Sequence, residues 1–394
     1  MKGHEINHCL AERTPPHCKL EFSIHILVAV IACNLIKSAA MFWTLFRQRE
    51  TTFVTFGDAL ASWLETPDES TANRCLTSKR DIVYPRKWRL SPPPKPSTPP
   101  PPVRFSLRDE HRWHSAISPT RWILSVASCL AAIAAASALL NSALSKPNPL
   151  LAPNPLTTQS FGSFSPATVL SIGVPPTGTT GLLLSVLLAN LPQLILSLLY
   201  LMYNGLYTSM HLAHEYASYA QTRKPLRVTS PKGSQRSTYW LQLPYSFGVP
   251  LILTSALLHW LTSQSLFLAR VSVWADGAQV DGGPRGVFSA VGYSPAPILC
   301  AVILGVVMLV GFVGVGFRRL AGGMPMAGSC SVALAAAAWR PEGDGEAAVK
   351  CVRWGVVVGE GEMEAEAEGR GELVGHCCFT SWEVGEPKEG RLYA

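Results

Sequence analysis

The chain has 394 residues, of which 48% are hydrophobic and only 15% charged, and its formal net charge is +7. Soluble domains average about 25% charged residues, so this chain has too few charges to cover a uniformly soluble globular protein. There is no glycine period, no sustained heptad repeat and no dense cysteine framework, which excludes collagen-like, coiled-coil and disulfide-scaffold proteins. The apolar residues form long clusters instead, and these indicate a membrane protein.

Five of these clusters are long enough to cross a bilayer as helices. A span requires about 20 mostly apolar residues, because a helix rises about 1.5 Å per residue and the hydrocarbon core is about 30 Å thick. We therefore expect an all-α transmembrane helix bundle of about five spans with a small cytoplasmic tail that contains a β-hairpin. The predicted spans are residues 21–46, 120–144, 182–207, 247–269 and 295–317.

The segments outside these spans alternate in their content of basic residues. Three of them hold 25 of the 33 Lys and Arg residues, and the other three hold six. Cytoplasmic loops carry the excess of Lys and Arg, which predicts an outer N-terminus and a cytoplasmic C-terminus in the plasma membrane or another secretory-pathway membrane. The basic segments are residues 47–119, 208–246 and 318–394, and the others are the N-terminal tail 1–20 and the loops 145–181 and 270–294.

The first basic loop begins with the pattern of a short amphipathic helix. Thr55 and Asp58 have the spacing of a capping box, and Pro67 marks the end of the helix. Two interpretations stay open: the helix lies at the cytoplasmic membrane interface, or it covers the base of the bundle. The apolar residues of its face are Phe53, Phe56, Leu60 and Trp63.

Residues 92–102 are rich in proline, which predicts an extended polyproline II linker. Pro99, Pro102 and Arg104 also fit the PxxPx-basic pattern that SH3-like domains bind. A cytoplasmic SH3-like domain protein is therefore a candidate partner, and a plain spacer is the alternative.

The C-terminal tail differs in composition from the rest of the chain. Two strand-like pieces, residues 352–358 and 376–384, flank an acidic run. This pattern predicts a β-hairpin or small sheet interrupted by an acidic loop. A tail of this size is marginal as an independent domain, so we expect it to fold against the bundle.

Polar residues inside membrane spans are the usual indication of function. Lys37 lies well inside the first span, where it either reaches cytoplasmic water or faces the bundle and lines an anion-accessible cavity. No span interior contains Asp or Glu, which disfavours proton-coupled transporters and cation channels. The candidate polar residues of the bundle interior are Lys37, Asn190, Gln193, His259 and Gln264.

Motifs for chemistry are missing from the sequence. His211, His214 and Glu215 read HLAHE, which is not the His-Glu-x-x-His order of zinc proteases. There is no Cys-x-x-Cys pair, no Walker loop, no dinucleotide fingerprint and no nucleic-acid module. We therefore predict no catalytic, metal-binding or cofactor-binding residues, no cofactor, no nucleic-acid partner and no enzymatic activity.

Aromatic residues gather around the ends of the third and fourth spans. Their amphipathic rings favour the headgroup region of a membrane, so we interpret them as an aromatic belt, with ligand binding as the alternative. They are Tyr200, Tyr203, Tyr207, Tyr216, Tyr219, Tyr239, Trp240 and Tyr245.

Two long blocks carry a resemblance to a known family. They read NLPQLILSLLYLMYNGLYTSMHLAHEYASYA and RKPLRVTSPKGSQRSTYWLQLPYSFGVPLILTSALLHWLTSQSLFLARV, and shorter pieces include GDALASWLE and GHCCFTSWEV. Over most of residues 24–394 the chain resembles an uncharacterised family of fungal multi-pass membrane proteins that is defined by a domain of unknown function. Members of that family have further N-terminal spans, so the resemblance implies that this chain lacks them. It implies no known activity and no site residues.

These observations lead to two expectations about function. The first is a multi-pass, non-enzymatic membrane protein that acts as a scaffold or in signalling through its cytoplasmic segments, with the lipid bilayer as its surroundings. The alternative is a transporter or channel with a polar path through the helix bundle.

Overall fold

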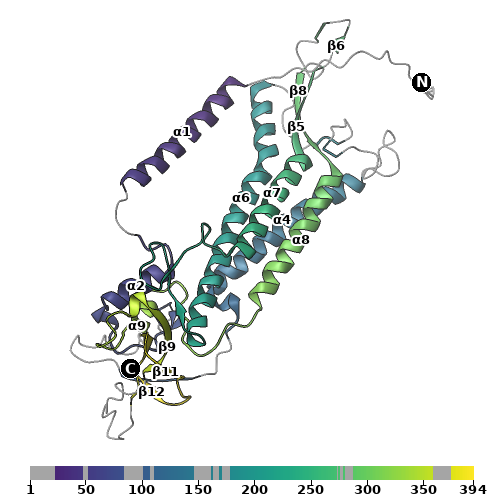
Figure 1. Cartoon of the computed structure of the whole chain (residues 1–394). Helices are drawn as coiled ribbons and strands as arrows, with labels where there is room; N and C mark the ends of the chain where they lie inside the picture. The colour runs from purple at the N-terminus through teal and green to yellow at the C-terminus, as the bar shows by residue number, and fades with distance from the viewer. Residues whose placement is uncertain are drawn as a thin grey trace. The chain divides into compact units, whose positions relative to one another are not determined.

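The computed structural model divides the chain into two compact units, Met1–Thr52 and Phe53–Ala394 (Figure 1). The first unit contains helix α1 (Ile24–Arg47), whose side chains are exposed within that unit. The structure describes residues 23–47, 52–83, 101–106, 111–145, 161–162, 168–170, 178–272, 274–275, 278–279, 287–357 and 374–394.

The second unit contains four long helices that pack as a bundle. Their main contacts run in the cyclic order α4, α8, α7, α6. Together with α1 they are five helices that are long and apolar enough to cross a membrane, which confirms the number of such segments expected from the sequence. The four are α4 (Pro119–Ser145), α6 (Gly178–Ala217), α7 (Tyr245–Ser265) and α8 (Pro295–Gly316).

Helix α6 is longer than the third predicted span, which ended at residue 207. Its continuation is amphipathic, and residues at alternating steps of three and four are buried on one face. Because 40 helical residues extend about 60 Å, α6 is about twice as long as the hydrocarbon core is thick. The buried residues of this face are Tyr203, Leu206, Met210, Ala213 and Ala217.

Two segments predicted to lie on the outer side meet at one end of the bundle. Strands β5 (Leu266–Ser272) and β8 (Val287–Tyr293) form an antiparallel pair. The amide of Leu170 donates to the carbonyl of Val291 at 2.8 Å, so the loop after α4 adds to this pair. The fourth predicted span, 247–269, therefore ends in a strand: α7 stops at Ser265 and β5 follows. Two short strands lie between β5 and β8 in the sequence and pair with each other in antiparallel orientation. They are β6 (Trp274–Ala275) and β7 (Ala278–Gln279).

A folded domain lies at the other end of the bundle and contains both helices and sheets, so an all-α fold was too narrow an expectation. The two predicted tail strands do pair: β10 lies antiparallel to β9. β11 and β2 also pair with β9, which makes a four-stranded sheet. The elements of this domain are α2 (Phe56–Glu65), α3 (Lys79–Val83), β1 (Val103–Arg104), β2 (Lys224–Pro225), β3 (Arg227–Val228), β4 (Arg236–Ser237), α9 (Ser331–Ala337), β9 (Cys351–Val357), β10 (Cys377–Thr380), β11 (Val384–Gly385) and β12 (Leu392–Tyr393).

One hydrophobic core holds this domain together, and all three basic segments contribute to it. Segments that the distribution of Lys and Arg assigns to one side of a membrane therefore fold as one body. The tail does not close its own core, because α2 and the end of α6 cover its sheet. Core residues include Phe56, Leu60 and Leu64 from the first segment, Tyr219, Leu226 and Val228 from the second, and Trp354, Phe379 and Tyr393 from the third.

Helix α2 begins with the predicted capping box. The Thr55 hydroxyl accepts from the amide of Asp58 at 3.1 Å, and the Asp58 carboxylate accepts from the amide of Thr55 at 2.8 Å. Phe56, Leu60 and Leu64 are buried in the domain core. These three side chains therefore pack into the domain, whereas Phe53 of the same predicted face is 61% exposed.

The proline-rich linker ends in a strand of the same domain. Pro99 lies outside the described residues, whereas Arg104 is part of β1, which pairs with β12. The Arg104 guanidinium donates to the carbonyl of Gly390 at 2.7 Å, and Phe105 is buried against Tyr393. An SH3-like partner would therefore compete with the domain for Arg104.

A buried titratable pair, His376 and Cys75, lies in the domain core. The two ring nitrogens of His376 lie 2.6 Å from the main-chain oxygen of Ala394 and 2.8 Å from the carbonyl oxygen of Trp339. Both oxygens only accept, so both nitrogens donate and the ring is a cation. Burial alone would lower the pKa of His376, but hydrogen bonding and charge interactions with Cys378 and Cys75 raise the pKa to about 11.

The Cys75 thiol has the opposite shift. Its hydrogen bond with Cys377 lowers the pKa most, burial opposes this, and the neighbouring His376 lowers the pKa further, to about 5. Hydrogen bonding from Cys377 and the neighbouring His376 therefore favour the ionised form of the Cys75 thiol.

This pair predicts a stability optimum. His376 stabilises the fold fully below its ordinary pKa of 6.5, and that contribution is lost as the pH rises toward 11. Cys75 stabilises fully above its ordinary pKa of 9.0, and its contribution is lost as the pH falls toward 5. The two slopes cancel between pH 6.5 and 9.0, so we expect a plateau there, with the free energy of unfolding falling on both sides.

Thermal unfolding of the purified protein between pH 5 and 11 measures this. His376→Gln is expected to make the fall in melting temperature between pH 9 and 11 smaller, and the fall that remains comes from Cys377 and Cys378, whose pKa values burial raises. The matched control His25→Gln, at an exposed site on α1, is expected to keep it. An identical alkaline fall in all three proteins would contradict the assignment.

Candidate functional site

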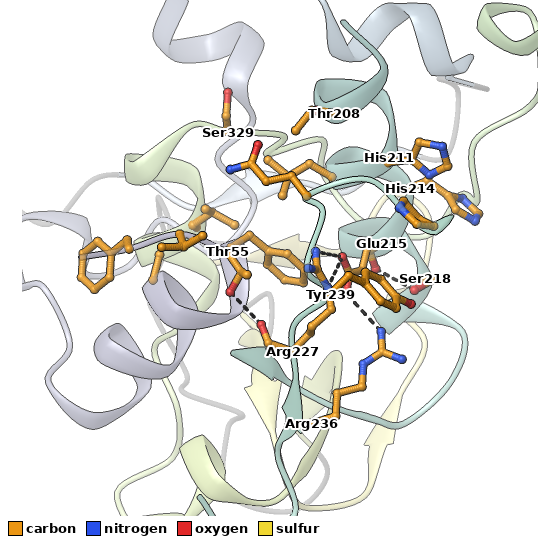
Figure 2. A pocket seen from close by; sticks show the side chains of 18 of the residues that line it. Thr55, Thr208, His211, His214, Glu215, Ser218, Arg227, Arg236, Tyr239 and Ser329 are labelled. Carbon is orange, nitrogen blue, oxygen red and sulfur yellow. Dashed lines mark hydrogen bonds and ion pairs between the residues drawn. The ribbon is translucent and has the colours of Figure 1, made fainter. Parts of the chain in front are cut away.

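A cavity of about 500 Å³ lies where the end of α6 enters the domain (Figure 2). Its lining comes from the beginning of α2, the last third of α6, the segment from Lys224 to Pro244, and residues 329–334. All three basic segments therefore meet at this cavity. The lining includes Thr55, His211, Glu215, Arg227, Arg236 and Tyr239.

An ion-pair network forms one wall of the cavity. The Glu215 carboxylate accepts from Arg227 Nε at 2.9 Å and from Nη2 at 2.7 Å, which is a bidentate arrangement. Arg236 Nη2 donates to the same carboxylate at 3.2 Å (Figure 2). The Arg227 side chain is 7% exposed and that of Glu215 is 19% exposed, so solvent screens this pair little.

Arg227 makes two further contacts. Nη1 donates to the Thr238 hydroxyl at 2.8 Å, and the guanidinium lies 5.4 Å from the ring centroid of Tyr239. Burial alone would lower the pKa of Arg227, but the hydrogen-bonded Glu215 carboxylate outweighs it and raises the pKa. Arg227 is therefore a permanent cation.

Helix α2 docks directly on β3 beside the network. The Thr55 hydroxyl donates to the Arg227 carbonyl at 2.7 Å (Figure 2), and the Asp58 carboxylate accepts from the amide of Thr229 at 2.8 Å. Burial raises the pKa of Asp58, but the amides of Thr229 and Thr55 outweigh burial, and the pKa is lowered. Gly57 permits the close approach, since a Cβ there would lie 2.1 Å from the Arg227 carbonyl oxygen.

Positive charge exceeds negative charge in the cavity lining. Lys224, Arg227 and Arg236 face a single carboxylate, Glu215. Within the described part of the chain, Lys224 forms no salt bridge. The lining therefore retains a net positive charge that suits an anion.

Two histidines extend this wall toward the bundle. His214 stacks on Trp113 with ring centroids 4.7 Å apart, and His211 contacts Phe247 at 4.3 Å. Nε2 of His211 is buried and has no hydrogen-bond partner among the residues that the structure describes. Across those same residues there is no group of three or more His, Cys, Asp or Glu suited to a metal ion.

The five polar candidates for the bundle interior lie in separate places. Gln193 on α6 and His259 on α7 bond to each other. Gln193 Nε2 donates to the His259 carbonyl at 3.0 Å, and Gln193 Oε1 lies 2.6 Å from His259 Nδ1. Asn190 is exposed and donates to the Val186 carbonyl of its own helix at 2.8 Å. Gln264 lies against Gly162, beyond the far end of the bundle from the domain. Lys37 belongs to the first unit and is exposed there.

Sequence reasoning missed the network of Glu215 with Arg227 and Arg236. The basic residues of segment 208–246 were used only to predict the orientation of the chain in the membrane. The aromatic residues near them were used only to predict an aromatic belt. One signal was available: Glu215 is a lone carboxylate at the end of a long apolar helix, and basic residues follow it within 21 positions. Such a carboxylate requires a cation when it is buried.

Glu215→Gln tests the role of this network. We expect the variant to lower the free energy of unfolding by about 3–5 kcal/mol, because it leaves the buried Arg227 cation without its carboxylate. Chemical denaturation of the purified protein measures the change. The matched control is Glu346→Gln, which breaks the exposed pair with Lys350 and is expected to leave the denaturation midpoint unchanged. Equal effects of the two substitutions would contradict the structural role of Glu215.

Comparison with known proteins gives one informative result. No curated protein and no solved structure matches the chain. A family model for a domain of unknown function matches residues 94–393, which include the four-helix bundle and most of the domain around the cavity. The chain therefore belongs to the family of the domain of unknown function DUF8419.

Proposed function

We propose that this protein is a non-enzymatic, multi-pass membrane scaffold that holds a folded domain at the cytoplasmic surface. The observation that carries the proposal is the common core of the three basic segments. These segments are separated in the sequence by apolar helices, yet they form one body at one end of the bundle. A scaffold requires such a body, because its surface must be fixed relative to the membrane.

Helix α6 provides the connection between membrane and domain. It runs without interruption from the bundle into the domain core, where Tyr216 and Tyr219 pack against Phe379. A continuous helix transmits position over its whole length, whereas a flexible linker does not. The domain is thus held at a constant distance from the bundle.

The arrangement of the bundle supports a scaffold over a transporter. A polar path requires side chains that face a common hydrated space. Gln193 and His259 instead satisfy each other between α6 and α7, and Asn190 bonds to its own helix. Polar groups that satisfy each other between helices stabilise packing.

The orientation can be tested with single engineered glycosylation sites. The native chain has no Asn-x-Ser/Thr sequon. Pro155→Asn completes a sequon with Thr157 in the predicted outer loop, and Lys232→Asn completes one with Ser234 in the predicted cytoplasmic loop. We expect an endoglycosidase-sensitive mass shift for Pro155→Asn and none for Lys232→Asn. The reverse pattern would overturn the orientation.

Ion flux distinguishes the scaffold from the alternative function. We expect K⁺ and Cl⁻ flux in proteoliposomes containing the full chain to equal that of protein-free liposomes, because Gln193 and His259 bond to each other and Asn190 bonds to its own helix. Liposomes with a known channel are the positive control. A flux clearly above the protein-free level, abolished by His259→Leu, would replace the scaffold proposal with a channel.

A further inference from the structure

We propose that the cavity at the end of α6 binds the phosphate-bearing headgroup of an anionic phospholipid. This inference goes beyond the scaffold role and rests only on the proposed membrane placement of the bundle. Three features of the site carry it: depth along α6, surplus positive charge, and a mixed polar and apolar lining.

The length of α6 places the cavity at headgroup depth. The apolar stretch 182–207 of this helix extends about 39 Å, which is more than the hydrocarbon thickness of about 30 Å. The α6 residues that line the cavity begin at Thr208 and end at Glu215. They therefore follow directly after the part of the helix that the hydrocarbon core accommodates.

The charges of the cavity suit a phosphate group. Glu215 is shared between Arg227 and Arg236, so one carboxylate faces three cations once Lys224 is counted. The Arg236 side chain is 48% exposed and has donors beyond its one contact with Glu215. Lys224 and Arg236 are thus the two cations able to reach an incoming phosphate, while Arg227 stays fixed.

The lining also contains apolar side chains that suit an acyl chain. Phe53 and Val54 line the cavity and are 61% and 49% exposed, and Leu212 and Trp63 lie in the same lining. Trp240, next to the lining residue Tyr239, is 98% exposed. Exposed aromatic and aliphatic residues beside a cationic cavity are unfavourable in water but favourable at a membrane interface. A soluble anion would leave these side chains unused.

The wall of the cavity nearest the bundle adds neutral polar residues to the lining. His211 packs against Phe247 and its Nε2 is buried, so this nitrogen is closed to the cavity. The Thr208 and Ser218 hydroxyls, which donate to the carbonyls of Asn204 and Glu215, lie in the same lining. The donors open to a headgroup are therefore those of Lys224 and Arg236.

Binding of soluble short-chain lipids to the full chain in phosphatidylcholine nanodiscs tests the proposal. The probes are dioctanoyl phosphatidic acid, dioctanoyl phosphatidylcholine and inorganic phosphate, each titrated while native mass spectrometry counts the bound molecules. Lys224→Gln and Arg236→Gln remove the two reaching cations. Lys232→Gln removes the same charge from an exposed position of the same loop that does not line the cavity, and it is the matched control.

We expect one saturable site for dioctanoyl phosphatidic acid, weakened about tenfold by Lys224→Gln and by Arg236→Gln, since each loses a charge-assisted hydrogen bond. Lys232→Gln is expected to bind as the unmodified chain does, and phosphatidylcholine is expected not to saturate. Inorganic phosphate that binds as tightly as the lipid would overturn the lipid assignment in favour of a soluble anion. Equal weakening by all three substitutions, or no saturable binding, would overturn the site itself.

Failure here is distinguishable from failure of the scaffold proposal. Ion flux and glycosylation report on the bundle and its orientation, and they do not depend on Lys224 or Arg236. Melting temperatures of the three variants establish that each is folded before its binding is compared.

Discussion

The buried ion pair between Glu215 and Arg227 is the interaction on which the arrangement of the domain depends. A guanidinium that is 7% exposed is stable only with a carboxylate in place, so the end of α6 determines where β3 lies. From β3, the carbonyl of Arg227 accepts from Thr55 and the amide of Thr229 donates to Asp58. The N-terminus of α2 is therefore positioned by a strand that is itself positioned by α6.

Residues 224–229, which include β3, also contact the sheet of the C-terminal tail. Lys224 and Pro225 form β2, which pairs with Val352 and Cys351 of β9. Residues 224–229 thus contact α6 through Arg227, α2 through Thr229 and the tail sheet through β2. This segment therefore links the other two basic segments, whose residues share one core with it.

Hydropathy predicted the long helices because each apolar stretch is a local property of the sequence. It missed the last turns of α6, where Thr208, Ser209 and His211 lower the hydropathy although the opposite face remains buried. The tail strands were predictable as strand-like pieces on either side of an acidic run, whereas β2 and β3 are two residues long and carry no period. The cavity was beyond sequence reasoning, because it depends on pairings between residues far apart in the chain.

The basic residues of the loop after α6 have two physical consequences that arise from one property. Their number is what predicts that the loop stays on the cytoplasmic side. After folding, Glu215 pairs with only two of them, Arg227 and Arg236, and Lys224 adds a further cation to the same cavity. The residues that predict the orientation of the chain are therefore also the residues that give the cavity lining its surplus positive charge.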